Sequence, residues 1–190
     1  MNINLQSLKA VSHLAAKKDT RYYLVGVLVE YTEWQTILVA TNGHALAARR
    51  METDNTGSGS FIIPLDTVDT ILRIKTKDSS FTIDVGDDGK CTASLAGQSV
   101  LFAPVEGKFP DWRKVIPRGP FSGHAAQFQP QYLMSFQKAA EALARKGTSL
   151  AIAYNGNAAA LVEVNGDQDF VGVIMPYKAD TPMSSPSWSH

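Results

Sequence analysis

The chain has 190 residues, of which 44% are hydrophobic and 19% charged, and its formal net charge is zero. This length and balance are typical of one large or two small globular domains, and the neutral charge excludes a globally basic nucleic-acid binder, so any such binding must depend on where charge lies. Cys91 is the single cysteine, which excludes an internal disulfide and a cysteine-based zinc site and favours a reducing compartment.

No apolar run approaches the ~18 residues that a membrane-spanning helix needs. The first ten residues lack the charged-then-apolar layout of a secretory signal. We therefore expect a cytoplasmic protein without a membrane partner.

The chain begins with an amphipathic pattern. Leu5, Leu8, Val11 and Leu14 share one arc of a helical projection, with charged residues opposite, which predicts a helix of about three turns. Residues 22–31 are rich in aromatic and β-branched side chains and predict a strand.

Residues 37–49, ILVATNGHALAAR, predict a hairpin. Two apolar runs, 37–40 and 45–48, flank a polar tip that contains Asn42-Gly43. An Asn-Gly pair between such runs favours a tight turn, in which both central residues take positive φ.

Two further cycles follow the first. Pro64 and Pro130 each occupy a point where a helix begins, and each predicted helix is preceded by a short strand and followed by three strands. The short strands are 61–63 and 126–128; the later strands are 81–85, 91–95, 99–104, 150–154, 159–164 and 170–176. Residues 107–120 predict a linker that packs through Trp112, and residues 179–190 predict a disordered tail.

The chain thus predicts three cycles of strand, helix and several strands. Repetition at a fixed spacing is typical of stacked supersecondary units, each of which buries one sheet face under its helix. We expect an α+β fold with shared antiparallel sheets and helices on one face.

Four stretches of the sequence resemble the bacterial DNA polymerase III beta subunit family, the sliding clamps. They are Arg21-Tyr22-Tyr23-Leu24 with Gly26, Val39–His44 with Leu46-Ala47, Gly107–Pro117 (GKFPDWRKVIP), and Val173–Pro176. They occur in the family's order at compatible spacing, and the resemblance covers about residues 5–178. The family's chain is longer, with three domains of two half-units each.

The resemblance implies a DNA-clamp fold for this chain. Residues 1–119 resemble the family's middle domain, with half-units 1–56 and 57–119, and residues 120–178 resemble the last half-unit. The first domain and the first half of the last domain have no counterpart. A ring of the family holds twelve half-units, so three per chain implies four chains; a two-fold dimer that joins the odd half-units is the alternative.

The resemblance also implies one hydrophobic pocket that binds short peptides of DNA polymerase and other replication proteins. A groove of apolar residues with a polar rim suits that role. The matching positions are Leu24, Thr41, Gly43, His44, Leu46, Pro110, Lys114, Val115, Val173, Met175 and Pro176. Ala45 stands where the family usually has arginine, so we expect altered peptide preference.

The segment that reaches toward duplex DNA in the family matches Lys17, Lys18, Arg21, Tyr22 and Tyr23, whose cations and aromatic rings suit phosphates and unstacked bases. The helices add a few more cations, namely Lys9, Arg73, Lys138 and Arg145. Asp66 and Asp69 share the second helix, which predicts a weakly positive channel. Without the family match, His44 would be interpreted as a hairpin-tip residue and Lys17-Lys18 as a solvated helix end.

Enzymatic motifs are missing from the sequence: it has no phosphate loop, nucleophile elbow or HExxH, and its four histidines show no metal spacing. We expect a non-catalytic accessory subunit without metal or cofactor. Its predicted function is that of a processivity factor, an oligomer that encircles DNA, with a clamp loader as a further candidate partner. The alternative is a clamp-derived interaction module that binds the same peptides without loading on DNA.

Overall fold

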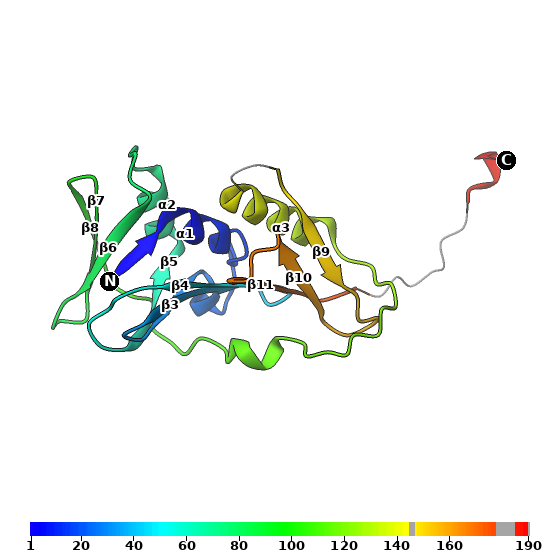
Figure 1. Cartoon of the computed structure of the whole chain (residues 1–190), viewed down its shortest axis with the longest axis horizontal. Helices are drawn as coiled ribbons and strands as arrows, with labels where there is room; N and C mark the ends of the chain where they lie inside the picture. Colours follow the sequence, from blue (N-terminus) through cyan, green and yellow to red (C-terminus); the bar gives the residue numbers. More distant parts are fainter. Residues whose placement is uncertain (145–146, 178–184, 190) are drawn as a thin grey trace.

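The computed structural model describes residues 1–144, 147–177 and 185–189. Figure 1 shows the elements in order along the chain: β1 (Asn2–Asn4), α1 (Leu5–Ser12), η1 (Tyr22–Leu24), β2 (Gly26–Tyr31), β3 (Gln35–Thr41), β4 (Ala45–Glu52), β5 (Gly59–Pro64), α2 (Leu65–Arg73), β6 (Ser80–Val85), β7 (Cys91–Leu95), β8 (Gln98–Phe102), η2 (Trp112–Val115), α3 (Pro130–Leu143), β9 (Leu150–Ala153), β10 (Ala160–Val164), β11 (Phe170–Ile174) and η3 (Ser187–Ser189). The η elements are short 3-10 helices.

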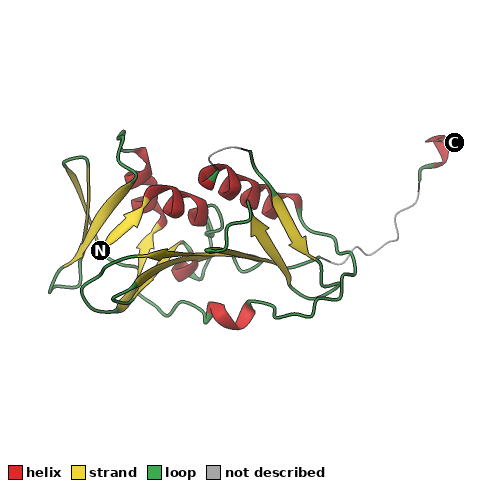
Figure 2. Ribbon diagram, viewed as in Figure 1, coloured by secondary structure: helices red, strands yellow, loops and turns green. Residues whose placement is uncertain are grey.

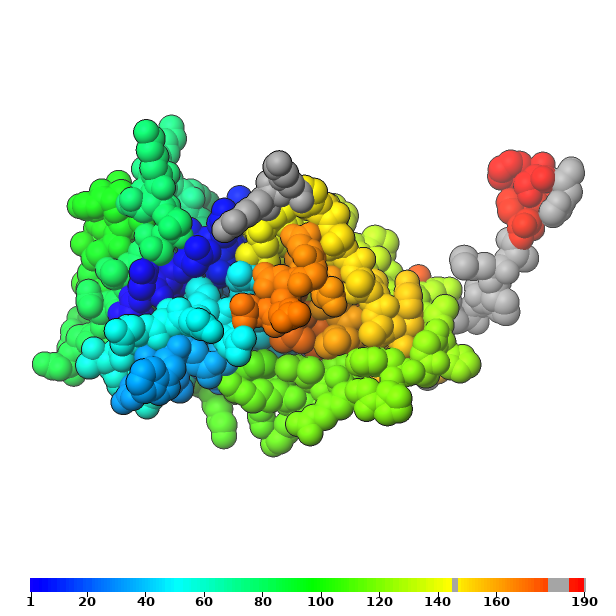
Figure 3. Space-filling model, in the orientation of Figure 1, coloured from blue at the N-terminus to red at the C-terminus, as the bar shows by residue number. Residues whose placement is uncertain are grey.

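The strands form two antiparallel sheets. The larger has seven strands in the order β5-β2-β3-β4-β11-β10-β9, and the smaller has four in the order β1-β6-β7-β8. The three α-helices lie on one side of the seven-stranded sheet, with α1 in contact with both α2 and α3 (Figure 2). The linker that contains η2 runs along the other side, where it is drawn in green (Figure 1 and Figure 3).

Three repeats build this arrangement. The first repeat comprises β1, α1 and β2 to β4, the second comprises β5, α2 and β6 to β8, and the third comprises residues 126–128, α3 and β9 to β11. The first and second repeats exchange their leading strands, because β1 pairs with β6 and β5 pairs with β2. The third repeat joins the first through β4 and β11. The domain bounds 1–119 and 120–178 remain a prediction.

The seven-stranded sheet is buried on both faces around its centre. Leu38 and Ala40 of β3 face the core beneath the helices, whereas Val39 faces a second core under the linker. Phe109 and Trp112 of the linker seal that second core, with 9% and 7% of their surface exposed, which agrees with the predicted packing of this segment. Burial on both faces explains why these strands are continuous apolar runs rather than alternating ones.

One close approach in the third repeat depends on glycine. Phe136 of α3 is fully buried, and a Cβ atom built on Gly172 of β11 would lie 2.5 Å from its ring. The missing side chain therefore allows α3 to pack directly on the sheet.

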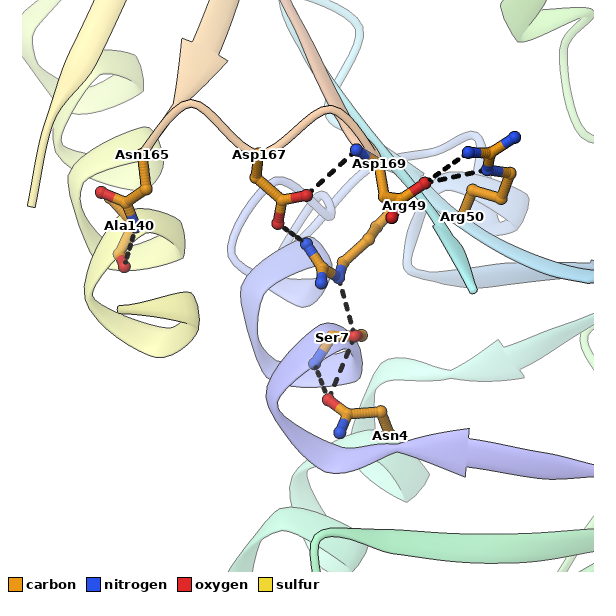
Figure 4. Close-up of polar contacts among 8 residues, drawn as sticks. All are labelled: Asn4, Ser7, Arg49, Arg50, Ala140, Asn165, Asp167 and Asp169. Atoms are coloured by element: carbon orange, nitrogen blue, oxygen red, sulfur yellow. Dashed lines mark hydrogen bonds and ion pairs between the residues drawn. The ribbon is translucent and has the colours of Figure 1, made fainter. Parts of the chain in front are cut away.

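Polar contacts secure the seam between the first and third repeats (Figure 4). Arg49 of β4 pairs with Asp167 and donates to the Ser7 hydroxyl of α1 at 2.9 Å. Arg50 pairs with Asp169 at 2.7 Å, and the Asn165 amide donates to the Ala140 carbonyl at the end of α3. The polar contacts around the β4–β11 pair thus fix both α1 and α3 against the sheet.

The hairpin at residues 37–49 is present, but its predicted turn geometry is wrong. Only Gly43 has positive φ, at 89°. The Asn42 side chain accepts the backbone N–H groups of His44 and Ala45, both at 2.9 Å, and the Thr41 hydroxyl donates to the Ala45 carbonyl. These side-chain bonds satisfy the turn, so the second positive φ is not needed.

Three other predicted elements differ at their ends. Residues 22–24 form η1 rather than strand, because Leu24 turns into the core under the linker and its carbonyl accepts the Ala16 N–H. The first helix ends at Ser12 and tightens into 3-10 bonds over the next turn. Residues 126–128 make a single bridge to the rest of the described chain, between Gln127 and Tyr177. The predicted disordered tail falls mainly on residues outside the described ones.

Candidate functional site

A cleft opens on the outer side of the seven-stranded sheet, where four segments distant in sequence converge. It is lined by Arg21, Leu24, Thr41, Gly43, His44, Ala45, Leu46, Pro110, Trp112, Val115, Val173 and Met175. Nine of the eleven residues predicted for the pocket therefore lie together. Lys114 and Pro176 do not line it: the Lys114 ammonium extends from the exposed linker and pairs with Asp111 at 3.0 Å, and Pro176 follows the end of β11.

Hydrogen bonds and packing hold the walls of the cleft. The Met175 N–H donates to the His44 carbonyl at 2.8 Å, which ties the end of β11 to the tip of the hairpin. The His44 ring stacks on Tyr132 of α3, with 5.5 Å between ring centroids and 15° between planes. The third repeat thus fixes both the strand end and the histidine at the site.

The floor of the cleft is apolar and the rim is accessible. Leu24, Leu46 and Val173 are each less than 5% exposed, whereas Val115 and Met175 are 50% and 44% exposed at the mouth. An apolar floor with an accessible mouth suits the anchoring side chains of an extended peptide.

Arg21 supplies the cationic group of the cleft. A Cβ atom built on Gly43 would lie 2.9 Å from its guanidinium, so the side chain lies across the hairpin tip. Asp19 holds it through bonds from Nε at 3.0 Å and Nη2 at 2.8 Å, and these bonds lower the pKa of Asp19 to about 2. The buried Ala45 beside it carries no charge of its own.

Arg21, a predicted DNA contact, lines the cleft, and so do Trp112 and Ala45, which stands where the family usually has arginine. Trp112 packs as predicted and also forms a wall of the cleft, and its buried indole N–H has no hydrogen-bond partner among the described residues. The Arg113 guanidinium lies 4.2 Å from the centre of its ring. The conspicuous aromatic residue within GKFPDWRKVIP was the available signal for this wall.

The predicted DNA-facing residues fall into three groups. Lys17, Lys18 and Lys138 line one groove between the end of α1 and α3, together with His13. Lys9 and Arg73 are exposed on α1 and α2.

The remaining candidates lie elsewhere. Tyr22 is 58% exposed, whereas Tyr23 is half-buried with its ring 6.0 Å from that of Tyr22. The two tyrosines are not part of the lysine groove, and Arg145 lies outside the described residues.

The lysine groove is more positive than the net charge of the chain indicates. Burial, followed by the nearby Lys138 and Lys9, lowers the pKa of His13, while Glu141 opposes the shift. Asp66 and Asp69 are exposed on α2. The groove thus carries three lysines and one carboxylate, that of Asp19, which is itself paired with Arg21.

Residues 1–144, 147–177 and 185–189 contain no helix long and apolar enough to cross a membrane. The same residues place no three histidine, cysteine, aspartate or glutamate side chains where they could share a metal ion.

Comparison with known proteins places these features in a family. Residues 4–111 match the model of the DNA polymerase III beta subunit, central domain. The beta sliding clamps of Proteus mirabilis and Escherichia coli K12 are 32% and 31% identical over 109 and 116 residues, which are 55% and 60% of this chain but only 29% and 31% of theirs.

Solved structures extend the likeness of the fold. The Pseudomonas aeruginosa sliding clamp superposes with a TM-score of 0.75 at 20% identity, covering 94% of this chain and 66% of that one. The Thermotoga maritima beta subunit gives 0.74 at 14% identity, covering 94% and 65%. The predicted α+β clamp fold is confirmed, on a chain that spans about a third of the length of its curated relatives. The chain belongs to the DNA polymerase III beta subunit family, the sliding clamps, and matches its central domain.

Proposed function

We propose that this chain is a non-catalytic, sliding-clamp-like processivity factor, which encircles duplex DNA as a homo-oligomer and holds replication proteins through the cleft. The convergence of Leu24, Leu46, Val115 and Val173 on one apolar cavity is the observation that carries this proposal. Such a cavity suits tethering, because binding a polymerase to a ring keeps it near its template without chemistry.

The cleft is suited to a peptide with apolar anchors. Its buried floor would take the anchoring side chains, and the exposed rim formed by Val115 and Met175 would close over them. The Arg21 guanidinium, which Asp19 fixes in place, would select a carboxylate or backbone carbonyl of the peptide. Arginine thus enters this cleft from the segment before η1, whereas the hairpin contributes the neutral Ala45.

The helix side of the molecule is proposed to face DNA. Lys17, Lys18 and Lys138, which line one groove, would contact phosphates, and His13 would add charge when DNA raises its pKa. Tyr22 and Tyr23 are proposed as further contacts with DNA. The acidic Asp66 and Asp69 would keep the affinity low enough for sliding.

Oligomerisation is supported by open sheet edges. Among the described strands, β8 and β9 are end strands of the two sheets, as are β1 and β5 at the opposite ends, and each has a strand partner on one side only. Open edges of this kind favour pairing with another chain. A closed ring of four chains would cover the β8 and β9 edges, whereas a two-fold dimer that joins the third repeats would cover β9.

Two binding measurements test the proposal together. A fluorescein-labelled peptide with leucine and phenylalanine anchors should bind, and 30-base-pair duplex DNA should bind with an affinity that falls steeply as salt rises. Binding of neither probe would contradict the proposed function.

The exposed Asp66 and Asp69 favour one alternative, an interaction module that competes for clamp-binding peptides without loading on DNA. Peptide binding combined with salt-independent absence of DNA binding would favour this alternative and contradict the ring.

A further inference from the structure

In the first two repeats, the leading strand of each repeat pairs with the edge of a strand in the other repeat. In the third repeat, both the leading segment and the edge of β9 lack such a partner among the described residues. β1 of the first repeat lies on the outer edge of β6, where Met1 and Ile83 exchange both backbone hydrogen bonds at 2.8 Å. β5 of the second repeat lies on the outer edge of β2. β9, the counterpart of β6, has only β10 beside it in the described sheet.

Residues 126–128 already occupy the position of a leading strand. In the second repeat the Val105 N–H donates to the Ile62 carbonyl at 3.0 Å, and in the third the Tyr177 N–H donates to the Gln127 carbonyl at 2.9 Å. Both donors lie three residues past the end of the repeat's last strand, and both acceptors lie three residues before the helix begins. One flank of residues 126–128 is therefore hydrogen-bonded as the corresponding flank of β5 is. The other flank of β5 pairs with β2, whereas the other flank of residues 126–128 has no neighbouring strand among the described residues.

The exposure of the leading segment also indicates an unfilled strand position beside it. The apolar residue two positions before the helix is fully buried in the first two repeats, as Ile3 and Ile63, but its counterpart Phe128 is only half-buried. Phe128 instead stacks on Tyr154, with 6.0 Å between ring centroids.

The receiving edge shows a matching difference. Phe81 and Ile83 of β6 are 2% and 1% exposed beneath β1. Their counterparts on β9, Leu150 and Ile152, are only half-buried, and Ile152 pairs with Val162 as Ile83 pairs with Ala93. The linker reaches only the end of this edge, where the Gly123 N–H donates to the Tyr154 carbonyl at 3.0 Å.

We propose that two copies of this chain join their third repeats about a two-fold axis by exchanging these strands. Residues 126–129 of each copy add to the outer edge of β9 of the other, so that Phe128 faces Leu150 as Ile3 faces Phe81. Gln127 then lies opposite Ala151, as Asn2 lies opposite Thr82.

A second copy fits this surface because the surface is self-complementary. The third repeat offers one donor strand and one acceptor edge, and a two-fold axis satisfies both at once. Within the described chain, the corresponding edges of β2 and β6 are already occupied by β5 and β1. This inference specifies the oligomer of the proposed function, but it rests on repeat geometry and can fail while DNA and peptide binding persist.

Disulfide trapping tests the register. The Asn2–Thr82 pair is the non-hydrogen-bonded kind, in which side chains lie closest, so a cysteine pair at its counterpart should cross-link readily. Gln127→Cys and Ala151→Cys are made as separate single variants of the full chain, mixed, and oxidised. The native Cys91 is buried, and burial raises the pKa of its thiol, so it should not compete.

The mixture should give a 127–151 disulfide dimer, identified by peptide mass spectrometry, at least tenfold above the yield from a control mixture of Gln127→Cys with Val85→Cys. Val85 is exposed at the end of β6, which belongs to the other sheet from β9. A yield equal to the control, or light scattering that finds only monomer at the trapping concentration, would overturn the proposal. An oligomer that forms without the 127–151 cross-link would refute this interface and leave the proposed function intact.

Discussion

Replacing Met175 by aspartate should abolish most peptide binding without unfolding the protein. Its side chain is 44% exposed at the mouth of the cleft, so a bound peptide would cover up to that fraction. Burying a whole methionine side chain contributes ~1.5–3 kcal/mol, and 44% of that is about 1 kcal/mol. Desolvating a carboxylate beside an apolar anchor adds roughly 1–3 kcal/mol, so the total of about 2–4 kcal/mol corresponds to a loss of about 30-fold to 700-fold.

Fluorescence anisotropy with the anchor peptide measures this loss. Met175→Ala removes only the apolar term and should weaken binding by roughly fivefold. Met134→Asp, at a 58% exposed methionine of α3 outside the cleft, is the matched control and should bind normally. Leu46→Asp is unsuitable, because Leu46 is only 4% exposed and the charge would destabilise the fold. Unchanged affinity for a folded Met175→Asp variant would refute the assignment of the cleft.

Three further predictions concern the seam and the helix side. Asp167→Ala leaves the largely buried Arg49 without the carboxylate that it pairs with, and should lower the free energy of urea unfolding by about 1–3 kcal/mol. Asp169→Ala removes an exposed pair with Arg50 and should lower it by less than about 1 kcal/mol, so equal losses would contradict the seam. Lys138→Ala should weaken duplex binding and lower the slope of log affinity against log salt by about 0.9, and an unchanged slope would remove Lys138 from the DNA face. Folding lowers the pKa of His13, so on acidification the unfolded chain binds a proton before the folded one does, and the free energy of unfolding should fall as the pH drops below ~6.5. His13→Gln should flatten that decline between about pH 7 and 5. An equally steep decline in the variant would exclude His13 as its cause.

Periodicity was sufficient to predict the elements whose burial is local. The helices that begin at Leu65 and Pro130 and the strands of the 37–49 hairpin follow from apolar spacing and from the residues that start or turn them. Residues 22–24 were mispredicted as strand because long-range packing of Leu24 overrides the strand preference of Tyr22 and Tyr23.

Periodicity could not predict which strands far apart in the sequence pair with one another. The exchange of β1 and β5 between repeats, and the junction of β4 with β11, depend on contacts that no local pattern encodes. The cleft was located through the family's motifs rather than through spacing, so Lys114 was included although it extends away. Arg21, a predicted DNA contact, lines the cleft because its orientation depends on Asp19, two residues before it, and periodicity does not encode that contact.

Topological retention on DNA tests the ring most directly. Chains are mixed with a nicked circular plasmid at a concentration where light scattering shows dissociation, concentrated to allow assembly, and passed through gel filtration in 0.5 M salt, which screens phosphate contacts. If the protein encircles DNA, it should elute with the circle and be released when a restriction enzyme linearises it. Equal loss from circular and linear DNA, from chains that assemble and bind peptide normally, would contradict encirclement.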